Sequence, residues 1–322
     1  MLARGVDSDL PCQKNNFHFS GSHEYARQKT PEKRLLQKPA INQMNHLSRQ
    51  RNNTVRALVE WIRGKIYGFR SLMVFDNWPS LLFQRLFLRD YPAFYRKGGV
   101  IFLADHKGRD QAGLRACLAT DMYSRFFSLF SRSKPLAVLD LGANSGGFGL
   151  ALSAGGFGIR RIVAVEITPR TFARLAFNLG YNFRCAATAL NCGVCGCEGP
   201  IRVRDNLGWV ANSIYEKEDR SDDFVTVPGV TFDQLYRDYF KNDKIDIAKI
   251  DIELAEYEIL YSDTCRNLTQ CEFLLIEIHP HPSLSTDALI ERIKKFGFEL
   301  VADGSPDCAW VYLFRNSSAA RG

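Results

Sequence analysis

The stretch AVLDLGANSGGFG, residues 137–149, decides the fold class. Its first part is a short apolar run, which is typical of a strand buried on both faces. Its second part is rich in glycine, which lets the backbone turn sharply and pass close to a ligand because no Cβ intervenes. A buried strand, a tight turn and an opening helix predict an open α/β sheet that binds a ligand at the carboxyl end of this strand.

The turn differs from the dinucleotide fingerprint G-x-G-x-x-G, because Asn144 stands two residues after Gly142 and Asp140 precedes the turn. An acidic residue at this place suits a cofactor that carries a cation better than one that carries a pyrophosphate. The next apolar run ends in Glu166, and a carboxylate at that strand end can accept both hydroxyls of a ribose. These features favour S-adenosylmethionine as the cofactor.

Strand-like and helix-like segments alternate from about residue 100 onward, which predicts an α/β, Rossmann-like fold with a mainly parallel twisted sheet and flanking helices. One helix should begin after Thr168 and close at Gly180. Runs at 298–303 and 309–314 predict a C-terminal antiparallel hairpin, and residues 185–230 predict a β-rich insertion between the third and fourth parallel strands. The clearest strand-like runs of the parallel sheet are 137–141, 161–166, 245–251 and 273–279.

A second group of charged residues lies in KIDIELAEYE, residues 249–258. Side chains alternate along a strand, so Lys249, Asp251 and Glu253 should project to one side. Asp251 then falls at the carboxyl end of its strand, beside the predicted cofactor cleft. Two alternatives stay open: Glu253 as a helix cap only, and Lys249 as a salt-bridge partner only.

Five segments, in this order and spacing, give the sequence a resemblance to the FkbM family of methyltransferases, over roughly residues 98–315. The sequence departs from the family at Leu254, where the family usually has glycine, and a bulky residue there opposes a close backbone approach at that turn. The segments that carry the resemblance are DLGANSGGFG, VEITPRTFARLAFNL, VTFDQLY, KIDIELAEYEIL and LLIEIHP.

The resemblance implies a class I, S-adenosylmethionine-dependent methyltransferase that methylates a hydroxyl of a sugar, a glycan or another small natural product. It also implies that Glu166 holds the ribose of the cofactor and that Asp251 lies near the transferred methyl group. The residues that it places at the methionine end of the cofactor are Asp140, Gly142, Ala143, Asn144 and Gly146.

An alcohol must lose its proton when it is methylated, so a carboxylate or a histidine should lie within hydrogen-bond reach. Asp251, Glu253, Glu277 and His279 are the available groups at neighbouring strand ends, and we take them as the candidate catalytic residues. A divalent cation held by Asp251 and Glu253 is an alternative, because hard cations prefer oxygen ligands. We expect no zinc site at CGVCGC, residues 192–197, because no second cysteine pair or nearby histidine pair completes it.

The net charge of +7 is confined to one part of the chain. Residues 1–70 hold 13 Lys and Arg against 5 Asp and Glu, whereas the other 252 residues hold 29 against 30. The catalytic part is therefore close to neutral, and we expect no nucleic-acid partner. The nine cysteines are scattered along the chain, which favours a reducing compartment over a disulfide framework. No apolar segment follows the first residues, so we expect a cytoplasmic protein without a secretory signal.

Three regions follow from the pattern along the chain. Residues 1–50 are basic, polar and without a period, which predicts disorder. Residues 51–97 predict a helical preface, and residues 98–322 predict the methyltransferase domain with its insertion near 185–230. The apolar and basic faces within 55–90 also predict a weak contact with a membrane surface or a protein.

Two other functions compete with an active O-methyltransferase. The first is a binding protein that keeps the cofactor fold without catalysis, with Leu254 as a mark of decay. The second is an RNA methyltransferase, against which the neutral catalytic part and the lack of an N-P-P-Y-type motif both argue.

Overall fold

The computed structural model describes residues 63–64, 66, 68–88, 91–107, 111–204, 224–304 and 310–318. The chain divides into two compact units, residues 1–66 and 67–322, and all the elements below belong to the second. The predicted disorder of residues 1–50 falls outside the described residues, as do residues 51–62 at the start of the predicted helical preface.

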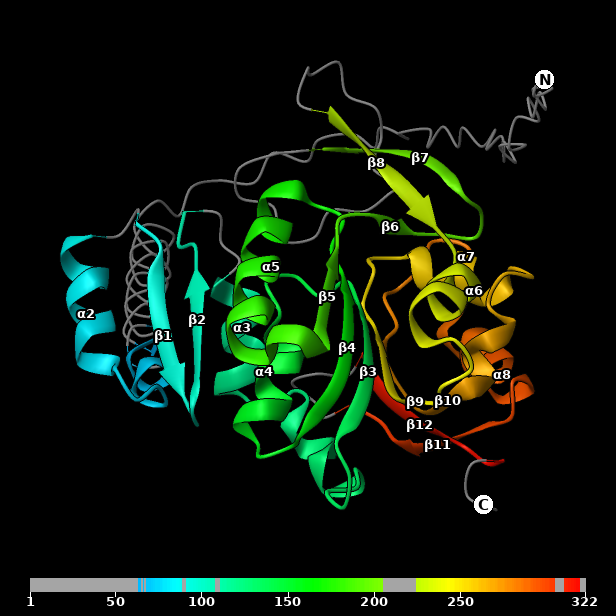
Figure 1. The fold of residues 1–322 in the computed structure, drawn as a ribbon, viewed down its shortest axis with the longest axis horizontal. Helices are drawn as coiled ribbons and strands as arrows, with labels where there is room; N and C mark the ends of the chain where they lie inside the picture. Colours follow the sequence, from blue (N-terminus) through cyan, green and yellow to red (C-terminus); the bar gives the residue numbers. More distant parts are fainter. Residues whose placement is uncertain are drawn as a thin grey trace, which may run out of the picture. The chain divides into compact units, whose positions relative to one another are not determined.

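A seven-stranded sheet runs through the second unit, with the strand order β11-β12-β10-β9-β3-β4-β5 (Figure 1). The strand β3 of the opening motif lies in the interior of the sheet, parallel to β9 and β4 on its two sides. The C-terminal hairpin joins the same sheet, because β12 pairs antiparallel with both β10 and β11. The strands are β3 Leu136–Leu141, β4 Ile159–Val165, β5 Ala187–Leu190, β9 Ile245–Ile250, β10 Cys271–Glu277, β11 Phe298–Ala302 and β12 Val311–Asn316.

Every residue of β3 is buried, because helices cover both faces of the sheet. Side-chain alternation sends Val138 into one apolar core and Leu139 into the other. Figure 1 shows α3, α4 and α5 on one side of the sheet and α6, α7 and α8 on the other. These helices are α3 Gln111–Ala119, α4 Gly147–Ala154, α5 Pro169–Phe183, α6 Phe232–Leu235, α7 Ala255–Tyr261 and α8 Thr286–Lys295. The predicted α/β, Rossmann-like fold, with a mainly parallel sheet and a C-terminal antiparallel hairpin, is confirmed.

Two local predictions need correction. The helix α5 begins after Thr168 as expected, but it continues through Gly180 and ends at Phe183. The run 187–190 is the edge strand β5 of the main sheet, where it pairs parallel with β4. The separate three-stranded sheet, with the order β6-β8-β7, begins only after β5. Its strands are β6 Gly193–Val194, β7 Gly199–Arg204 and β8 Phe224–Val230.

The segment before the main sheet is helical only in part. The helix α2, Trp78–Phe87, is followed by an antiparallel hairpin of β1, Ala93–Lys97, and β2, Val100–Ala104, which the sequence analysis did not foresee. Two asparagines of α5 fasten this hairpin to the main sheet's helical layer. The Asn178 amide bonds both the N–H and the C=O of Leu103, and the Asn182 amide does the same at Ile101. The two side chains thus continue the hydrogen-bond ladder that β2 would otherwise leave open.

The helix α2 leaves large apolar side chains in solvent, with Phe83, Leu86 and Phe87 all more than half exposed. This face lies within the segment for which we predicted a weak membrane or protein contact, and that contact stays a prediction. None of the described helices combines the length and the apolar character that crossing a membrane requires.

Candidate active site

The glycine-rich turn after β3 is built around positive backbone φ angles, 72° at Gly142, 50° at Asn144 and 96° at Gly146. A Cβ on Gly142 would lie 1.7 Å from the carbonyl oxygen of Asp251. Position 142 therefore requires glycine for a steric reason, because the backbone that follows β9 passes directly against it. The Asp251 N–H donates to the Leu141 carbonyl at 3.0 Å, which keeps the two strand ends in register.

Glu166 ties the glycine-rich turn to the start of α5. Its Oε2 accepts from the Asn144 N–H at 3.0 Å, and its Oε1 accepts from the Thr168 N–H at 2.8 Å. Burial raises the pKa of this carboxyl, and the bonds from Thr168 and Asn144 offset part of that rise. The Thr168 side chain also bonds to this carboxylate. A carboxylate has about four lone-pair sites, so after these three bonds it can still accept one from a ribose hydroxyl.

Lys249 is a buried ammonium at the centre of the site. Its Nζ donates to the Gly142 carbonyl at 2.8 Å, lies 3.1 Å from Asp251 Oδ2, and lies 3.5 Å from Asp140 Oδ1. Burial alone would lower the pKa of Lys249, but Asp251 and Asp140 hold it above its ordinary value. Lys249 therefore forms salt bridges, as one of the alternatives predicted. Its partners are Asp140 and Asp251, one from each of the two acidic motifs.

A cavity opens at the carboxyl ends of β3, β4, β9 and β10. Of the six predicted cofactor residues, Gly142, Ala143, Asn144 and Glu166 line it. Asp140 and Gly146 do not; Asp140 is fully buried and faces Lys249 instead of the cavity. The charged residues of the lining are Glu166, Lys249, Asp251, Glu253 and Glu277.

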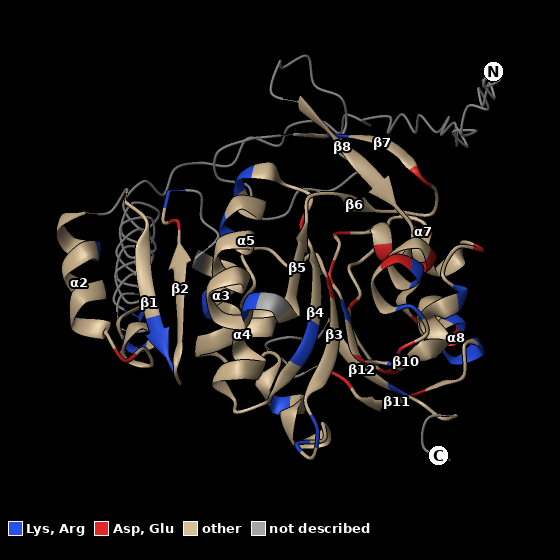
Figure 2. Ribbon diagram, viewed as in Figure 1, with Lys and Arg blue, Asp and Glu red and all other residues tan. Residues whose placement is uncertain are grey.

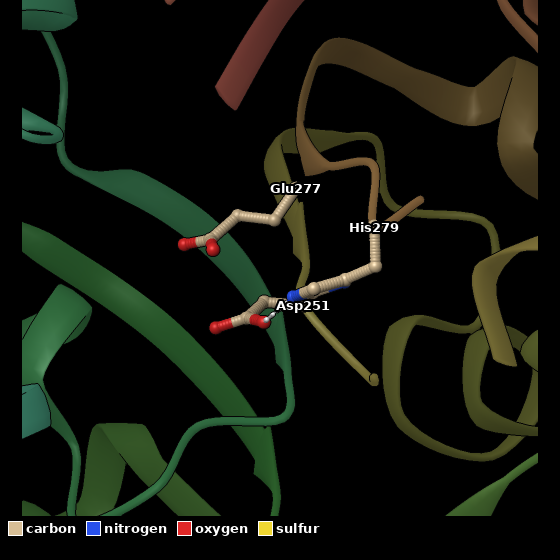
Figure 3. Close-up of side chains that lie close together, drawn as sticks. All are labelled: Asp251, Glu277 and His279. Carbon is tan, nitrogen blue, oxygen red and sulfur yellow. Dashed lines mark ion pairs between the residues drawn. The ribbon is translucent and has the colours of Figure 1, made fainter. Parts of the chain in front are cut away.

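Three of the predicted catalytic residues, Asp251, Glu253 and Glu277, line this cavity. His279 is not part of the lining but lies next to Asp251 and Glu277 (Figure 3). Asp251, Glu277 and His279 come from the ends of β9 and β10, and one polar atom of each lies within 4.8 Å of the others. Glu253 joins them, with its Oε2 3.5 Å from His279 Nε2. Strand alternation does not place Glu253, however, because β9 ends at Ile250 and Glu253 sits in a tight turn with φ 50°.

Tyr123 was not foreseen as a site residue. Its hydroxyl donates to Glu277 Oε1, and both side chains are buried. Burial and the nearby Asp251 raise the pKa of Glu277 to about 7, although Lys249 and Tyr123 act in the opposite direction. Tyr123 precedes a short 3-10 helix, Ser124–Leu129, and no sequence motif marks its contact with a strand end more than 150 residues away.

Glu256, on α7, holds His279 in place. Its Oε1 accepts from the His279 backbone N–H at 2.9 Å and lies 3.1 Å from the ring Nδ1. Although burial opposes the charged ring, Glu256, Glu253 and Asp251 raise the pKa of His279 to about 9. In Figure 2 the start of α7 is coloured as acidic. The cavity lining nearby adds the carboxylates of Asp251, Glu253 and Glu277.

The divalent cation stays a prediction. Asp251, Glu277 and His279 form one group whose spacing a metal ion could bridge, and Glu253, the second expected ligand, is outside that group. Lys249 already contacts Asp251, and Tyr123 already donates to Glu277. A cation would have to share both carboxylates with these donors.

The sequence matches the family model of the methyltransferase FkbM domain over residues 140–300, which is half of the chain. The chain belongs to this family. The matched segment contains the glycine-rich turn, Glu166 and all four predicted catalytic residues.

Two solved structures of methyltransferases overlap with the chain. The FkbM methyltransferase of Methylobacillus flagellatus is 18% identical over 61% of this chain and 47% of that one, with a TM-score of 0.43. TrmK of M. capricolum, in complex with S-adenosyl-homocysteine, is 11% identical over 62% of this chain and 70% of that one, with a TM-score of 0.37. The chain thus spans about half the length of the FkbM structure. No curated protein sequence matches it significantly.

The departure from the family's glycine at Leu254 has a structural consequence. Leu254 adopts φ 79° and ψ −17°, the left-handed region, directly before α7. A residue with a Cβ pays about 1–2 kcal/mol for this conformation, whereas glycine adopts it freely. The turn between the catalytic residues and α7 therefore stores strain that the family's glycine would not.

Leu254→Gly should increase the free energy of unfolding by up to about 1 kcal/mol, because the relief of strain exceeds the greater flexibility that glycine gives the unfolded chain. Denaturant unfolding measures the change. Leu284→Gly is the control, since Leu284 is a more exposed leucine whose φ is not positive, and it should give no gain. A loss of more than 1 kcal/mol in Leu254→Gly would contradict this account of the turn.

Proposed function

We propose that this protein is an S-adenosylmethionine-dependent methyltransferase that methylates a hydroxyl oxygen. One observation carries the proposal: the described lining of the cavity holds four carboxylates and a single ammonium, that of Lys249. That ammonium is already paired with Asp251 and Asp140, so the cavity as a whole is negative. A negative cavity attracts a sulfonium and an amino group and repels a pyrophosphate.

The residues of the cavity fit this cofactor at both ends. Glu166 stands at the end of β4 with a lone pair left for a ribose hydroxyl, and Ala143 and Asn144 of the glycine-rich turn line the cavity beside it. The carboxylates of Asp251, Glu253 and Glu277 surround the opposite end. When bound there, S-adenosylmethionine supplies an electrophilic methyl group whose bond to sulfur breaks with both electrons remaining on the sulfur.

We assign the removal of the acceptor's proton to Glu277. Its carboxyl has a pKa near 7, which is where a general base works best at neutral pH. Tyr123 fixes Oε1 by a hydrogen bond, which leaves Oε2 to accept the proton as the hydroxyl oxygen bonds to the methyl carbon. Asp251 is the weaker candidate for this step, because it is the counter-ion of Lys249.

The acceptor end of the site suits a sugar or a similar polyhydroxylated small molecule. Carboxylates and an imidazole that are partly exposed can bond hydroxyl groups. Trp310 is more than half exposed, and its ring centre lies 6.2 Å from that of His279. An exposed indole beside polar groups offers an apolar face on which a sugar ring can stack.

The full-length protein should bind S-adenosylmethionine and should not bind NAD in titration calorimetry. Glu166→Ala should weaken the binding by about 1–3 kcal/mol, because the ribose and the glycine-rich turn both lose a charged hydrogen-bond partner. Glu291→Ala, an exposed carboxylate on α8, is the control and should bind as the parent does. Binding of NAD without binding of S-adenosylmethionine would contradict the proposal.

A panel of sugars, glycans and hydroxylated natural products, tested with methyl-labelled cofactor, should contain an acceptor. Tight cofactor binding without transfer to any member would favour a binding protein that has lost catalysis.

For such an acceptor, kcat/KM should fall about tenfold for each pH unit below about 7, because protonated Glu277 cannot accept a proton. Glu277→Gln should lower turnover by about 10²–10⁴-fold and remove this inflection. Glu272→Gln, on the same strand but paired with Arg315, should leave the profile unchanged. A Glu277→Gln profile equal to that of the parent would remove Glu277 from the reaction.

A further inference from the structure

The imidazole of His279 is held from behind by α7. Glu256 is fully buried, and its Oε1 contacts both the backbone N–H and the ring Nδ1 of His279. The hydroxyl of Tyr257, the next residue, donates to the His279 carbonyl at 3.0 Å. These contacts fix both the backbone and the ring orientation of His279, and they thereby fix the direction of its Nε2 atom.

Nε2 points into a gap between two carboxylates. Glu253 Oε2 lies 3.5 Å away and Asp251 Oδ1 lies 3.9 Å away. Both distances exceed those of an N–H···O hydrogen bond, which are about 2.7–3.2 Å. All three side chains are partly exposed, between 13% for His279 and 33% for Glu253, so a small group can reach the gap from solvent.

The gap matches the chemistry of a hydroxyl group. A hydroxyl can accept a hydrogen bond from Nε2–H and donate one to a carboxylate at the same time, which an ether, an ammonium group or a fully deprotonated phosphate cannot do. The raised pKa of His279 agrees with this, since the ring carries a proton on Nε2 at neutral pH. The charged groups that surround the ring are Glu256 on α7, Asp251 and Glu253 in the turn, and Glu277 on β10.

We propose that Glu256 is a positioning residue for substrate recognition, which aims His279 so that Nε2, Glu253 and Asp251 together bind a second hydroxyl of the acceptor. This inference rests on the proposed function, in which Glu277 faces the hydroxyl that is methylated. The two places are close, because one polar atom each of Glu277, Asp251 and His279 lies within 4.8 Å of the others. Such a short separation fits hydroxyl groups on adjacent carbons, so the acceptor is a vicinal diol, as in a pyranose ring.

The test of the positioning role needs no acceptor. The chain has six histidines, so the imidazole nitrogens can be resolved by ¹⁵N NMR and the His279 signals assigned with His279→Gln. Glu256→Gln should lower the measured pKa of His279 by at least about one unit, because it removes the closest negative charge. Glu258→Gln, on the same helix but bonded to the Gly196 N–H, is the matched control and should leave the His279 signals unchanged.

Methyl pyranosides and their deoxy counterparts, which lack one of two adjacent hydroxyls, test the diol site in the protein saturated with S-adenosyl-homocysteine. At least one diol should shift the His279 ring signals, and its deoxy counterpart should bind about tenfold more weakly. In Glu256→Gln this preference for the diol should disappear. If Glu256→Gln does not fold, Glu253→Gln serves instead, because it removes an acceptor from the gap without touching the Glu256 contacts.

Unchanged His279 signals in Glu256→Gln, or equal binding of every diol and its deoxy counterpart, would overturn the inference. Failure of the proposed function has a different signature, because cofactor binding is measured separately by calorimetry. A protein that binds S-adenosylmethionine but shows no diol preference would keep the proposed function and lose only this inference.

Discussion

The site depends on one buried ammonium, that of Lys249. Its three oxygen partners come from the end of β3, from the glycine-rich turn and from the residue after β9. A buried charge is costly unless it is paired, and removal of one partner leaves the others uncompensated. The DLGANSGGFG and KIDIELAE segments are therefore parts of one electrostatic unit. Gly142 adds a steric reason, because a Cβ there would collide with the Asp251 carbonyl.

The pairing of Lys249 with Asp140 and Asp251 explains how an acidic site can be stable and still bind a cationic cofactor. Lys249 neutralises Asp140, which is wholly buried, and holds Asp251 at the edge of the cavity. Two of the three other carboxylates in the lining are fixed by other donors: Glu166 by two backbone amides and Glu277 by Tyr123. The excess negative charge thus faces the cavity, where a cationic cofactor can offset it.

Much of the fold was predictable because its signals are local. Apolar runs, an N-cap such as Thr168 and the alternation of strands and helices define each element within a few residues. The convergence of Asp251, Glu277 and His279 was also predictable, since the carboxyl ends of parallel strands meet at one edge of the sheet. Contacts between distant segments were not. No local sequence pattern marks the hydrogen bond of Tyr123 to Glu277 or the amide hydrogen bonds of Asn178. The turn at Glu253 was also missed, because the residues around it favour a helix.

The most direct test of the central role of Lys249 is a double-mutant cycle with Lys249→Met and Asp251→Asn, measured as free energies of unfolding in denaturant. Lys249→Met alone should be strongly destabilising, by about 3–5 kcal/mol, because two acidic groups lose their buried partner. Asp251→Asn should cost less in the Lys249→Met background, with a coupling of about 0.5–3 kcal/mol between the two sites. If the two costs simply add, Lys249 does not join the two motifs.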